Sequence, residues 1–377
     1  ATSAFPIRAG CRITSWRWPD SAPPFSIRLP QHWLTWSKAA CSGVLQNLPL
    51  RIRSDCPGRA WCAVPMPVPS TVLAPMLSFL PPVLRGAIAT MLLIANTVFW
   101  CCLLLLMAPI KLLFPWPGVR RHVDPLLNRM ARGWVSCNGG WMRLTQDTRW
   151  DVGGVAQLDD QDWYLVNCNH QSWVDVLVLQ RVLNRRVPLL KFFLKRQLIY
   201  VPLIGLAWWA LDFPFLRRQT KGDLRRNPNQ RLADREATLR ACQRFARLPT
   251  SVVSFAEGTR FTPAKHQGSP YRHLLKPKAG ALALTLGAMG TQFHSMLDAT
   301  IVYPAGAPDL WSFLCGRVPR IIVRVRQVPI PPQFSHGDYA QDRGFRRAFH
   351  QWLETIWEFK DQQIGALLEH DRSAAPA

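Results

Sequence analysis

The chain has 377 residues, with 46 Lys and Arg against 23 Asp and Glu, and a formal net charge of +23. A hydrophobic fraction of 48% excludes a chain that is disordered throughout, and the length suits one large domain or two ordinary ones. Such a charge predicts a polyanionic partner, which leaves nucleic acid, an anionic membrane surface and phosphorylated substrates open. The 17 Trp favour a membrane, because tryptophan gathers at membrane–water interfaces.

The 10 Cys do not follow a metal-binding pattern. No C-x-x-C occurs, Cys101 and Cys102 are adjacent inside an apolar run, and the others are widely scattered. This distribution predicts reduced packing residues in a reducing compartment.

Residues 1–75 are rich in Pro, Arg, Ser, Trp and Cys, and they show no sustained helical or strand period. The chain begins with Ala1, so we interpret this segment as a non-native or disordered extension, with Met76 or Met66 as the natural start. The intact mass of the native protein would test this. Without the segment the chain keeps 38 basic and 21 acidic residues, a net charge of +17, so it remains strongly basic and a polyanionic partner is still expected.

Residues 86–110, GAIATMLLIANTVFWCCLLLLMAPI, form a stretch of 25 residues without a charge. As a helix it would measure roughly 37 Å, enough to span a bilayer core with some tilt. A secretory signal is the rival interpretation, but Lys111, Arg120 and Arg121 follow instead of a small-residue cleavage site. The positive-inside rule then places the following domain in the cytoplasm.

Residues 120–145 mix basic and apolar side chains, which predicts an interfacial helix lying on the headgroups. The predicted membrane anchor therefore covers residues 76–145, and from about residue 150 the pattern becomes α/β. The predicted strands are 162–168, 250–255, 299–303 and 319–328, and the predicted helices are 172–184, 190–198, 233–248, 277–289 and 345–370. The expected fold class is α/β, with N-terminal transmembrane and interfacial helices before a sheet domain over 146–370.

The segment NHQSWVD places His170 and Asp175 between a predicted strand and a predicted helix. In one regular helix the two side chains would point about 140° apart, so they meet only if His170 lies in the preceding turn. Ser172-x-x-Asp175 is a capping-box pattern with Ser172 as the N-cap, which supports that placement. Two compatible interpretations stay open: a helix cap, and an imidazole base whose tautomer a carboxylate fixes.

The segment FAEGTR follows the strand predicted at residues 250–255. Gly258 permits a tight turn, and Arg260 suits a bidentate contact with a phosphate. Glu257 suits a hydrogen bond from a substrate hydroxyl, or a contact that holds the arginine. Taken alone, this segment is better explained as an ordinary turn with a local Glu–Arg pair.

Together the two segments resemble the glycerolipid acyltransferase family, typified by lysophosphatidate acyltransferases. N-H-x-x-x-x-D is followed about 80 residues later by F-x-E-G-T-R. The family's third block, ending F-[IV]-x-R, is similar to residues 215–218, and its last block, an apolar strand closing on proline, is similar to residues 301–304. The resemblance covers roughly residues 80–365, and FLKRQLIYVPLIGLAWWALDFPFLRR looks like the YihG-like branch of bacterial inner-membrane acyltransferases.

The resemblance implies a mixed-sheet acyltransferase domain in which His170 is the general base and Asp175 orients it. It implies that the acceptor phosphate is bound by Glu257, Gly258, Thr259, Arg260 and Arg218. The acyl donor would be acyl-CoA or acyl-carrier protein, and neither a metal nor a bound organic cofactor is expected. Ala256, where the family usually has proline, and Asp212, where it commonly has glycine, depart from the pattern in the acceptor-binding blocks.

The expected reaction moves a fatty acyl group to the sn-2 hydroxyl of lysophosphatidic acid and yields phosphatidic acid for phospholipid biosynthesis. The expected location is the bacterial inner membrane, with the catalytic domain facing the cytoplasm. Two alternatives stay open: another lysophospholipid or membrane amphiphile as acceptor, and a membrane lipid-binding protein without turnover. A nucleic-acid partner is not expected, because the chain has an apolar spanning stretch and no recognisable recognition motif. The sequence leaves open the acceptor headgroup, the acyl chain, the donor and the oligomeric state.

Overall fold

The structure is a computed structural model that describes residues 76–374 apart from 115, 214, 217–247, 294, 336, 338 and 340. Every described residue belongs to one compact unit, Met66–Ala377. The extension predicted over residues 1–75, nearly all of the helix predicted over 233–248, and Arg218 lie outside the described residues.

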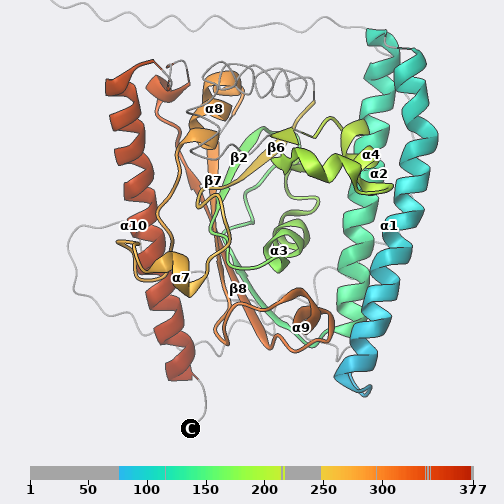
Figure 1. Cartoon of the computed structure of the whole chain (residues 1–377), viewed down its shortest axis with the longest axis horizontal. Coiled ribbons are helices and arrows are strands. Elements are labelled where there is room, and N and C mark those ends of the chain that lie inside the picture. Colours follow the sequence, from blue (N-terminus) through green and yellow to red (C-terminus); the bar gives the residue numbers. More distant parts are fainter. Residues whose placement is uncertain are drawn as a thin grey trace, which may run out of the picture. The chain divides into compact units, whose positions relative to one another are not determined.

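A mixed six-stranded sheet forms the centre of the described chain, in the strand order β1-β8-β7-β2-β6-β3 (Figure 1). All neighbouring strands are parallel except β7 and β8, so the prediction of a mixed sheet is confirmed. The strands are β1 Arg149–Gly153, β2 Tyr164–Cys168, β3 Leu190–Phe192, β6 Ser251–Phe255, β7 Ser295–Val302 and β8 Arg320–Val328. A second, two-stranded sheet pairs β4 Leu194–Lys195 with β5 Phe215–Leu216 in parallel.

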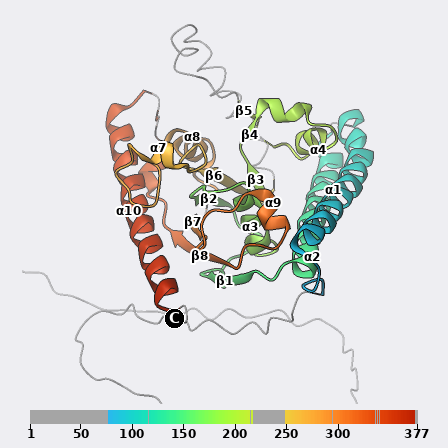
Figure 2. The same ribbon diagram turned by 60° about the horizontal axis from the view of Figure 1, so that its bottom comes forward.

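Helices cover both faces of the sheet (Figure 2). Successive residues of β2 show this: Val166 packs in a cluster with Val178 of α3, whereas Leu165 packs in another with Leu286 of α8 and Trp357 of α10. The helices of this domain are α3 Val174–Leu183, α4 Ile204–Ala210, α7 Pro263–His266, α8 Gly280–Met289, α9 Leu310–Leu314 and α10 Arg343–Ala374, with 3-10 turns at Arg196–Tyr200 and Pro332–Phe334.

The helix predicted over residues 190–198 is wrong, because these residues form β3, β4 and the 3-10 turn Arg196–Tyr200. Leu190–Phe192 is buried throughout beside β6, Lys191 included, and three residues are too few for a strand period to be recognised. The sequence also did not reveal β1, whose Asp151 is ion-paired to Arg320 and Arg324 of β8. The other predicted elements among the described residues are confirmed, with shifted ends.

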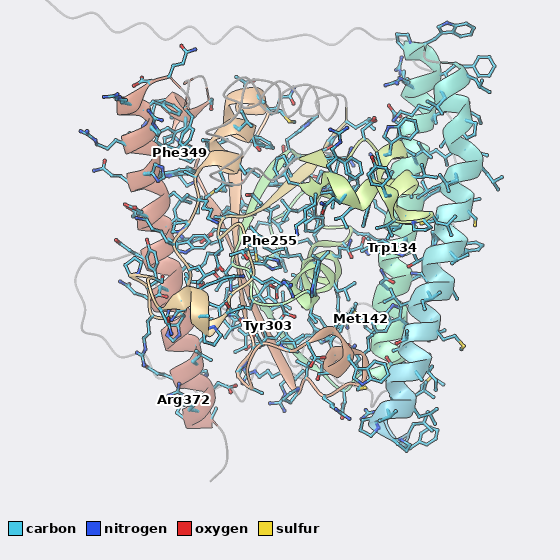
Figure 3. The ribbon with its side chains drawn as sticks, in the orientation of Figure 1. Trp134, Met142, Phe255, Tyr303, Phe349 and Arg372 are labelled. Carbon is cyan, nitrogen blue, oxygen red and sulfur yellow. The ribbon has the colours of Figure 1, made fainter. Side chains whose placement is uncertain are left out.

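The predicted apolar helix exists as α1 Pro82–Leu113, and α2 Pro117–Thr145 runs back beside it (Figure 1). Asn96 of α1 donates to Asn138 of α2 at 2.8 Å, and the indole of Trp134, labelled in Figure 3, donates to Thr97 at 3.1 Å. Among the described residues, α1 alone is long and apolar enough to cross a membrane, by length and composition.

Both ends of α1 contact the α/β domain. Near its start, a Cβ added to Gly86 would lie 2.5 Å from the sulfur of Cys315, which follows α9 directly. At its end, Lys111 donates to the carbonyl of Ala210 in α4 at 3.1 Å. The opposite face exposes large apolar side chains, namely those of Met91, Ile94, Val98, Phe99 and Leu106. A continuous apolar face of this kind marks a surface for lipid or for another protein.

Candidate functional site

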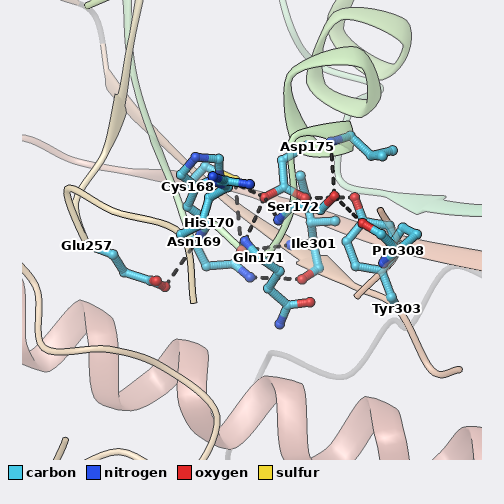
Figure 4. A network of polar contacts seen from close by, with 12 residues as sticks. Cys168, Asn169, His170, Gln171, Ser172, Asp175, Glu257, Ile301, Tyr303 and Pro308 are labelled. Carbon is cyan, nitrogen blue, oxygen red and sulfur yellow. Dashed lines mark hydrogen bonds and ion pairs between the residues drawn. The ribbon is translucent and has the colours of Figure 1, made fainter. Parts of the chain in front are cut away.

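The candidate site lies where β2 and β6 end. The two strands are parallel neighbours, and Cys168, the last residue of β2, is level with Phe255, the last residue of β6. The segments that the sequence singled out therefore leave the sheet at the same edge, where ligands bind in open α/β sheets. This is why His170 and Glu257, 87 positions apart, lie side by side (Figure 4).

The turn after β2 is held from both sides. The side chain of Asn169 exchanges two hydrogen bonds of 2.9 Å with the backbone of Ile301, so it continues the pairing of β2 with β7 beyond the last strand residue. On the other side, the amide of Phe261 donates to the carbonyl of His170 at 2.8 Å. The turn at Asn169 and His170 is therefore fixed between β7 and the loop that follows β6.

The carboxylate of Asp175 is the centre of the polar network in Figure 4. Its Oδ2 lies 2.9 Å from Nδ1 of His170 and accepts the amides of Gln171 at 2.6 Å and Ser172 at 2.8 Å. Its Oδ1 accepts the hydroxyl of Tyr303 at 2.7 Å. Asp175 is fully buried, and such a set of donors satisfies a buried carboxylate.

Both interpretations of NHQSWVD describe the geometry. Ser172 Oγ accepts the amide of Val174 at 3.1 Å, and Asp175 accepts the amide of Ser172, as in a capping box, although the N-cap position of α3 is Trp173, one residue after the predicted Ser172. The same carboxylate oxygen binds Nδ1 of His170. When Nδ1 donates its proton to Asp175, Nε2 keeps the lone pair that a general base needs.

The imidazole of His170 is held flat against a ring. It stacks on Phe255, with ring centroids 4.1 Å apart and planes 17° apart. The His170 side chain is 14% exposed, whereas Asp175 behind it is fully buried. One edge of the ring is thus anchored, and the group remains accessible to a substrate.

Glu257 lies beside the histidine and is 1% exposed. Its Oε1 accepts the backbone amide of His170 at 3.4 Å, and its Oε2 is buried with no hydrogen-bond partner among the described residues. Burial raises the pKa of Glu257 to about 8, against a smaller lowering by that amide and by Lys360. Near neutral pH this carboxyl group is therefore mostly protonated, and its unpartnered oxygen can donate a hydrogen bond.

The residues after Glu257 form a tight turn. Gly258 has a φ of +66°, a conformation that side chains rarely adopt, and an added Cβ would lie 3.1 Å from Cδ of Lys278. Thr259 accepts a hydrogen bond from Nζ of Lys265 at 2.8 Å. The guanidinium of Arg260 lies over the ring of Trp173, 4.6 Å from its centroid, so this turn does not contain the local Glu–Arg pair considered from the sequence.

A buried charge network lies behind the site. Lys360 of α10 is fully buried, and its Nζ lies 2.9 Å from Oδ1 of Asp298 in β7. Asn167 donates to the same oxygen at 3.1 Å, and Arg326 of β8 donates to Oδ2 at 3.1 Å. This network joins α10 to three central strands directly below the residues of the candidate site.

Of the predicted site residues, the structure brings His170, Asp175 and Glu257 into one cluster and places Gly258, Thr259 and Arg260 in the adjoining turn. Their roles stay predictions. Sequence reasoning missed the supporting residues Asn169, Phe255, Asp298, Tyr303 and Lys360. Tyr303 could have been found, because it follows an apolar strand and precedes a proline. No local signal in the sequence indicates that Lys360 pairs with Asp298.

Glu257 gives a prediction about pH and stability. The folded protein holds its proton up to a pKa of about 8, whereas an exposed glutamate releases it near 4.5. This contribution to stability is therefore complete below about pH 4.5 and is lost as the pH rises through 8, at up to roughly 1.4 kcal/mol per pH unit. We expect Glu257→Gln, which copies the neutral carboxyl group, to flatten this slope and to be more stable than the wild type at alkaline pH.

Denaturant unfolding of both proteins at several pH values between 5 and 9 measures this difference. Parallel pH profiles for the two proteins would show that Glu257 is ionised in the folded state.

The geometry defines an α/β protein with an imidazole–carboxylate pair at the carboxyl end of parallel strands, an arrangement suited to general-base chemistry. Residues 149–306 match the family model described as Acyltransferase, and this segment contains both loops of the site. The 1-acyl-sn-glycerol-3-phosphate acyltransferase gamma of Mus musculus is 24% identical over 236 residues, covering 59% of this chain and 57% of the relative. The delta enzyme of Homo sapiens is 26% identical over 213 residues, covering 52% and 51%.

A crystal structure of the 1-acyl-sn-glycerophosphate acyltransferase PlsC from Thermotoga maritima aligns with a TM-score of 0.44 and 14% identity, over 78% of this chain and 96% of that one. The chain spans a little over half the length of the curated relatives it matches. The family model over residues 149–306 and these curated relatives support the resemblance to the glycerolipid acyltransferase family. The YihG-like branch within it stays a prediction.

Proposed function

We propose that the chain transfers a fatty acyl group from a thioester to the sn-2 hydroxyl of lysophosphatidic acid, yielding phosphatidic acid. The observation that carries the proposal is the 2.9 Å contact between Nδ1 of His170 and the buried carboxylate of Asp175. A hydroxyl is a weak nucleophile near neutral pH, and an oriented neutral imidazole is the group that activates it. The match to the Acyltransferase model and the similarity to 1-acyl-sn-glycerol-3-phosphate acyltransferases support acyl transfer to a lysophosphatidate.

In the proposed reaction, Nε2 of His170 takes the proton of the acceptor hydroxyl as the oxygen attacks the thioester carbonyl. Asp175 stabilises the imidazolium that forms, and Tyr303 holds the other oxygen of that carboxylate. Collapse of the tetrahedral intermediate breaks the carbon–sulfur bond, and the imidazolium protonates the departing thiolate. The protonated carboxyl of Glu257, with one unpartnered oxygen, is placed to donate a hydrogen bond to the reacting groups.

The acceptor phosphate is proposed to bind at the turn of Gly258, Thr259 and Arg260, with Arg218 assisting. Arg260 lies over the exposed ring of Trp173, which leaves the edge of its guanidinium for a bidentate contact with phosphate. Lys278 lies against Gly258 and adds a second cation to this turn. Acyl-CoA or acyl-carrier protein supplies the acyl group, and the proposed chemistry uses no metal or bound organic cofactor.

The chain is proposed to act at the bacterial inner membrane, with its catalytic domain on the cytoplasmic side. The exposed apolar face of α1 agrees with this, and α1 has the length to cross. However, the α/β domain contacts α1 near both ends, which suits a helical hairpin that enters one leaflet better than a simple crossing. Protease protection of the catalytic domain in oriented membrane vesicles would test both the side and the depth.

The experiment that tests the reaction uses detergent-solubilised protein, labelled acyl-CoA and lysophosphatidic acid, with formation of phosphatidic acid as the readout. We expect many product molecules per protein molecule, and a lower rate when the acceptor is lysophosphatidylcholine or lysophosphatidylethanolamine. A higher rate with one of those acceptors would support the alternative of another lysophospholipid. Absence of turnover with every acceptor, with either acyl-CoA or acyl-carrier protein as donor, would support a lipid-binding protein without catalysis.

A further inference from the structure

A cavity away from the His170 site lies where the tip of the α1–α2 hairpin meets α4. Its volume is about 210 Å³. It is lined by residues of three segments, namely Ala108, Lys111, Leu112, Arg120, Trp209, Ala210 and Asp212. None of these belongs to β2, β6 or the loops that follow them, so the cavity is separate from the cluster of His170, Asp175 and Glu257.

The acidic side chains at this cavity already have cationic neighbours. Lys111 is buried, is ion-paired with Asp124 at 3.1 Å and donates to Asp212. Lys191 is buried close by; burial lowers its pKa to about 8, and Asp212 and Asp124 partly offset that effect. Two carboxylates are therefore balanced by two lysines, and neither lysine is left over for a ligand.

Arg120 is the additional cation. It lines the cavity from the first turns of α2, and its Nε is buried without a hydrogen-bond partner. Within the described part of the chain it forms no ion pair, not even with Asp124 one helical turn along. A buried guanidinium nitrogen without a hydrogen-bond acceptor is unfavourable, although the Arg120 side chain as a whole is partly exposed, and its planar set of donors matches a phosphate in a bidentate contact. The arrangement therefore calls for an anionic group in the cavity.

The surface around the cavity indicates what carries that anionic group. Leu112 and Trp209, which line the cavity, are 57% and 41% exposed. The hairpin tip adds Leu113, Phe114 and Trp116, which are all exposed. Tryptophan and a cation beside exposed apolar side chains are typical of the level of lipid headgroups. A phosphate attached to acyl chains can contact both Arg120 and the exposed apolar side chains around it, whereas a free phosphate can contact only Arg120.

We propose that the cavity lined by Arg120, Leu112 and Trp209 binds the phosphate of a membrane phospholipid, as a headgroup site separate from the active site. The bound lipid would hold the hairpin tip at the membrane surface. The proposal does not depend on acyl transfer, because it concerns only how the chain attaches to the bilayer.

The test compares Arg120→Gln with Arg121→Gln in the full chain. Arg121 is exposed on the same helix and does not line the cavity, so both variants lose one positive charge from the same turn. Flotation with vesicles of phosphatidylcholine, with and without phosphatidic acid, measures binding. Soluble dihexanoyl phosphatidate and inorganic phosphate serve as competitors, and acyl transfer in neutral detergent micelles serves as a control for the active site.

We expect Arg120→Gln to bind the anionic vesicles about tenfold more weakly than Arg121→Gln, since it alone loses a charge-assisted contact with phosphate. Dihexanoyl phosphatidate should compete with the vesicles for the wild type, and acyl transfer in micelles should be unchanged in both variants. Equal binding by the two variants would overturn the proposal, because only general surface charge would then matter. Competition by inorganic phosphate as strong as by the lipid would also overturn it, in favour of a free-phosphate site.

Discussion

Substitution of His170 by alanine is expected to lower the rate of acyl transfer about a thousandfold and to leave the fold intact. General-base catalysis by an oriented imidazole contributes roughly 10² to 10⁴ in rate, and no other described histidine contacts Asp175. The fold should survive because the carboxylate of Asp175 keeps three donors after the change, from Gln171, Ser172 and Tyr303. Lost stacking on Phe255 is the main structural cost.

The measurement is the initial rate of phosphatidic acid formation, together with the thermal unfolding midpoint of the same preparations. His122→Ala is a matched control, since His122 is exposed on α2 and has no part in the site. The control should keep the wild-type rate. If His170→Ala kept that rate as well, NHQSWVD would be a helix cap and nothing more, and the base would have to be sought elsewhere.

The candidate site could be predicted because its main features are local. His170 and Asp175 belong to one turn, and the capping pattern of Ser172 and Asp175 predicts the start of α3 to within one residue. Glu257 follows a β-branched strand, but the turn alone is better explained as structural, and only the resemblance to the acyltransferase family singled it out. Only the parallel pairing of β2 with β6 was needed to bring the two loops together, and the strand–helix alternation predicts such pairing.

The remaining features depend on residues far apart in the chain. Tyr303 reaches Asp175 from the end of β7, and Lys360 reaches Asp298 from a helix whose amphipathic pattern would place a lysine in water. The strand β3 was read as a helix because its length and burial leave no alternation to detect. Hydrophobic periodicity reports which face of an element is buried, and it does not report a buried ion pair between two elements.

Replacement of Lys360 by methionine is expected to destabilise the protein by about 3–5 kcal/mol, the usual cost of removing one partner of a buried ion pair. The ammonium group is fully buried against Asp298, which is itself 2% exposed. Methionine fills a similar volume, so the loss would come from charge rather than from a cavity. Asp298 would keep Arg326 and Asn167 as donors but would lose its closest cation.

Thermal unfolding should show this as a fall in the midpoint on the order of 10 °C for a domain of this size. Arg347→Met, on the exposed face of the same helix, is the control and should change the midpoint little. A double variant that adds Asp298→Asn should recover part of the loss, because no buried carboxylate is then left without its cation. If Lys360→Met unfolded at the wild-type midpoint, Arg326 and Asn167 alone would satisfy Asp298, and α10 would be held to the sheet by its apolar face.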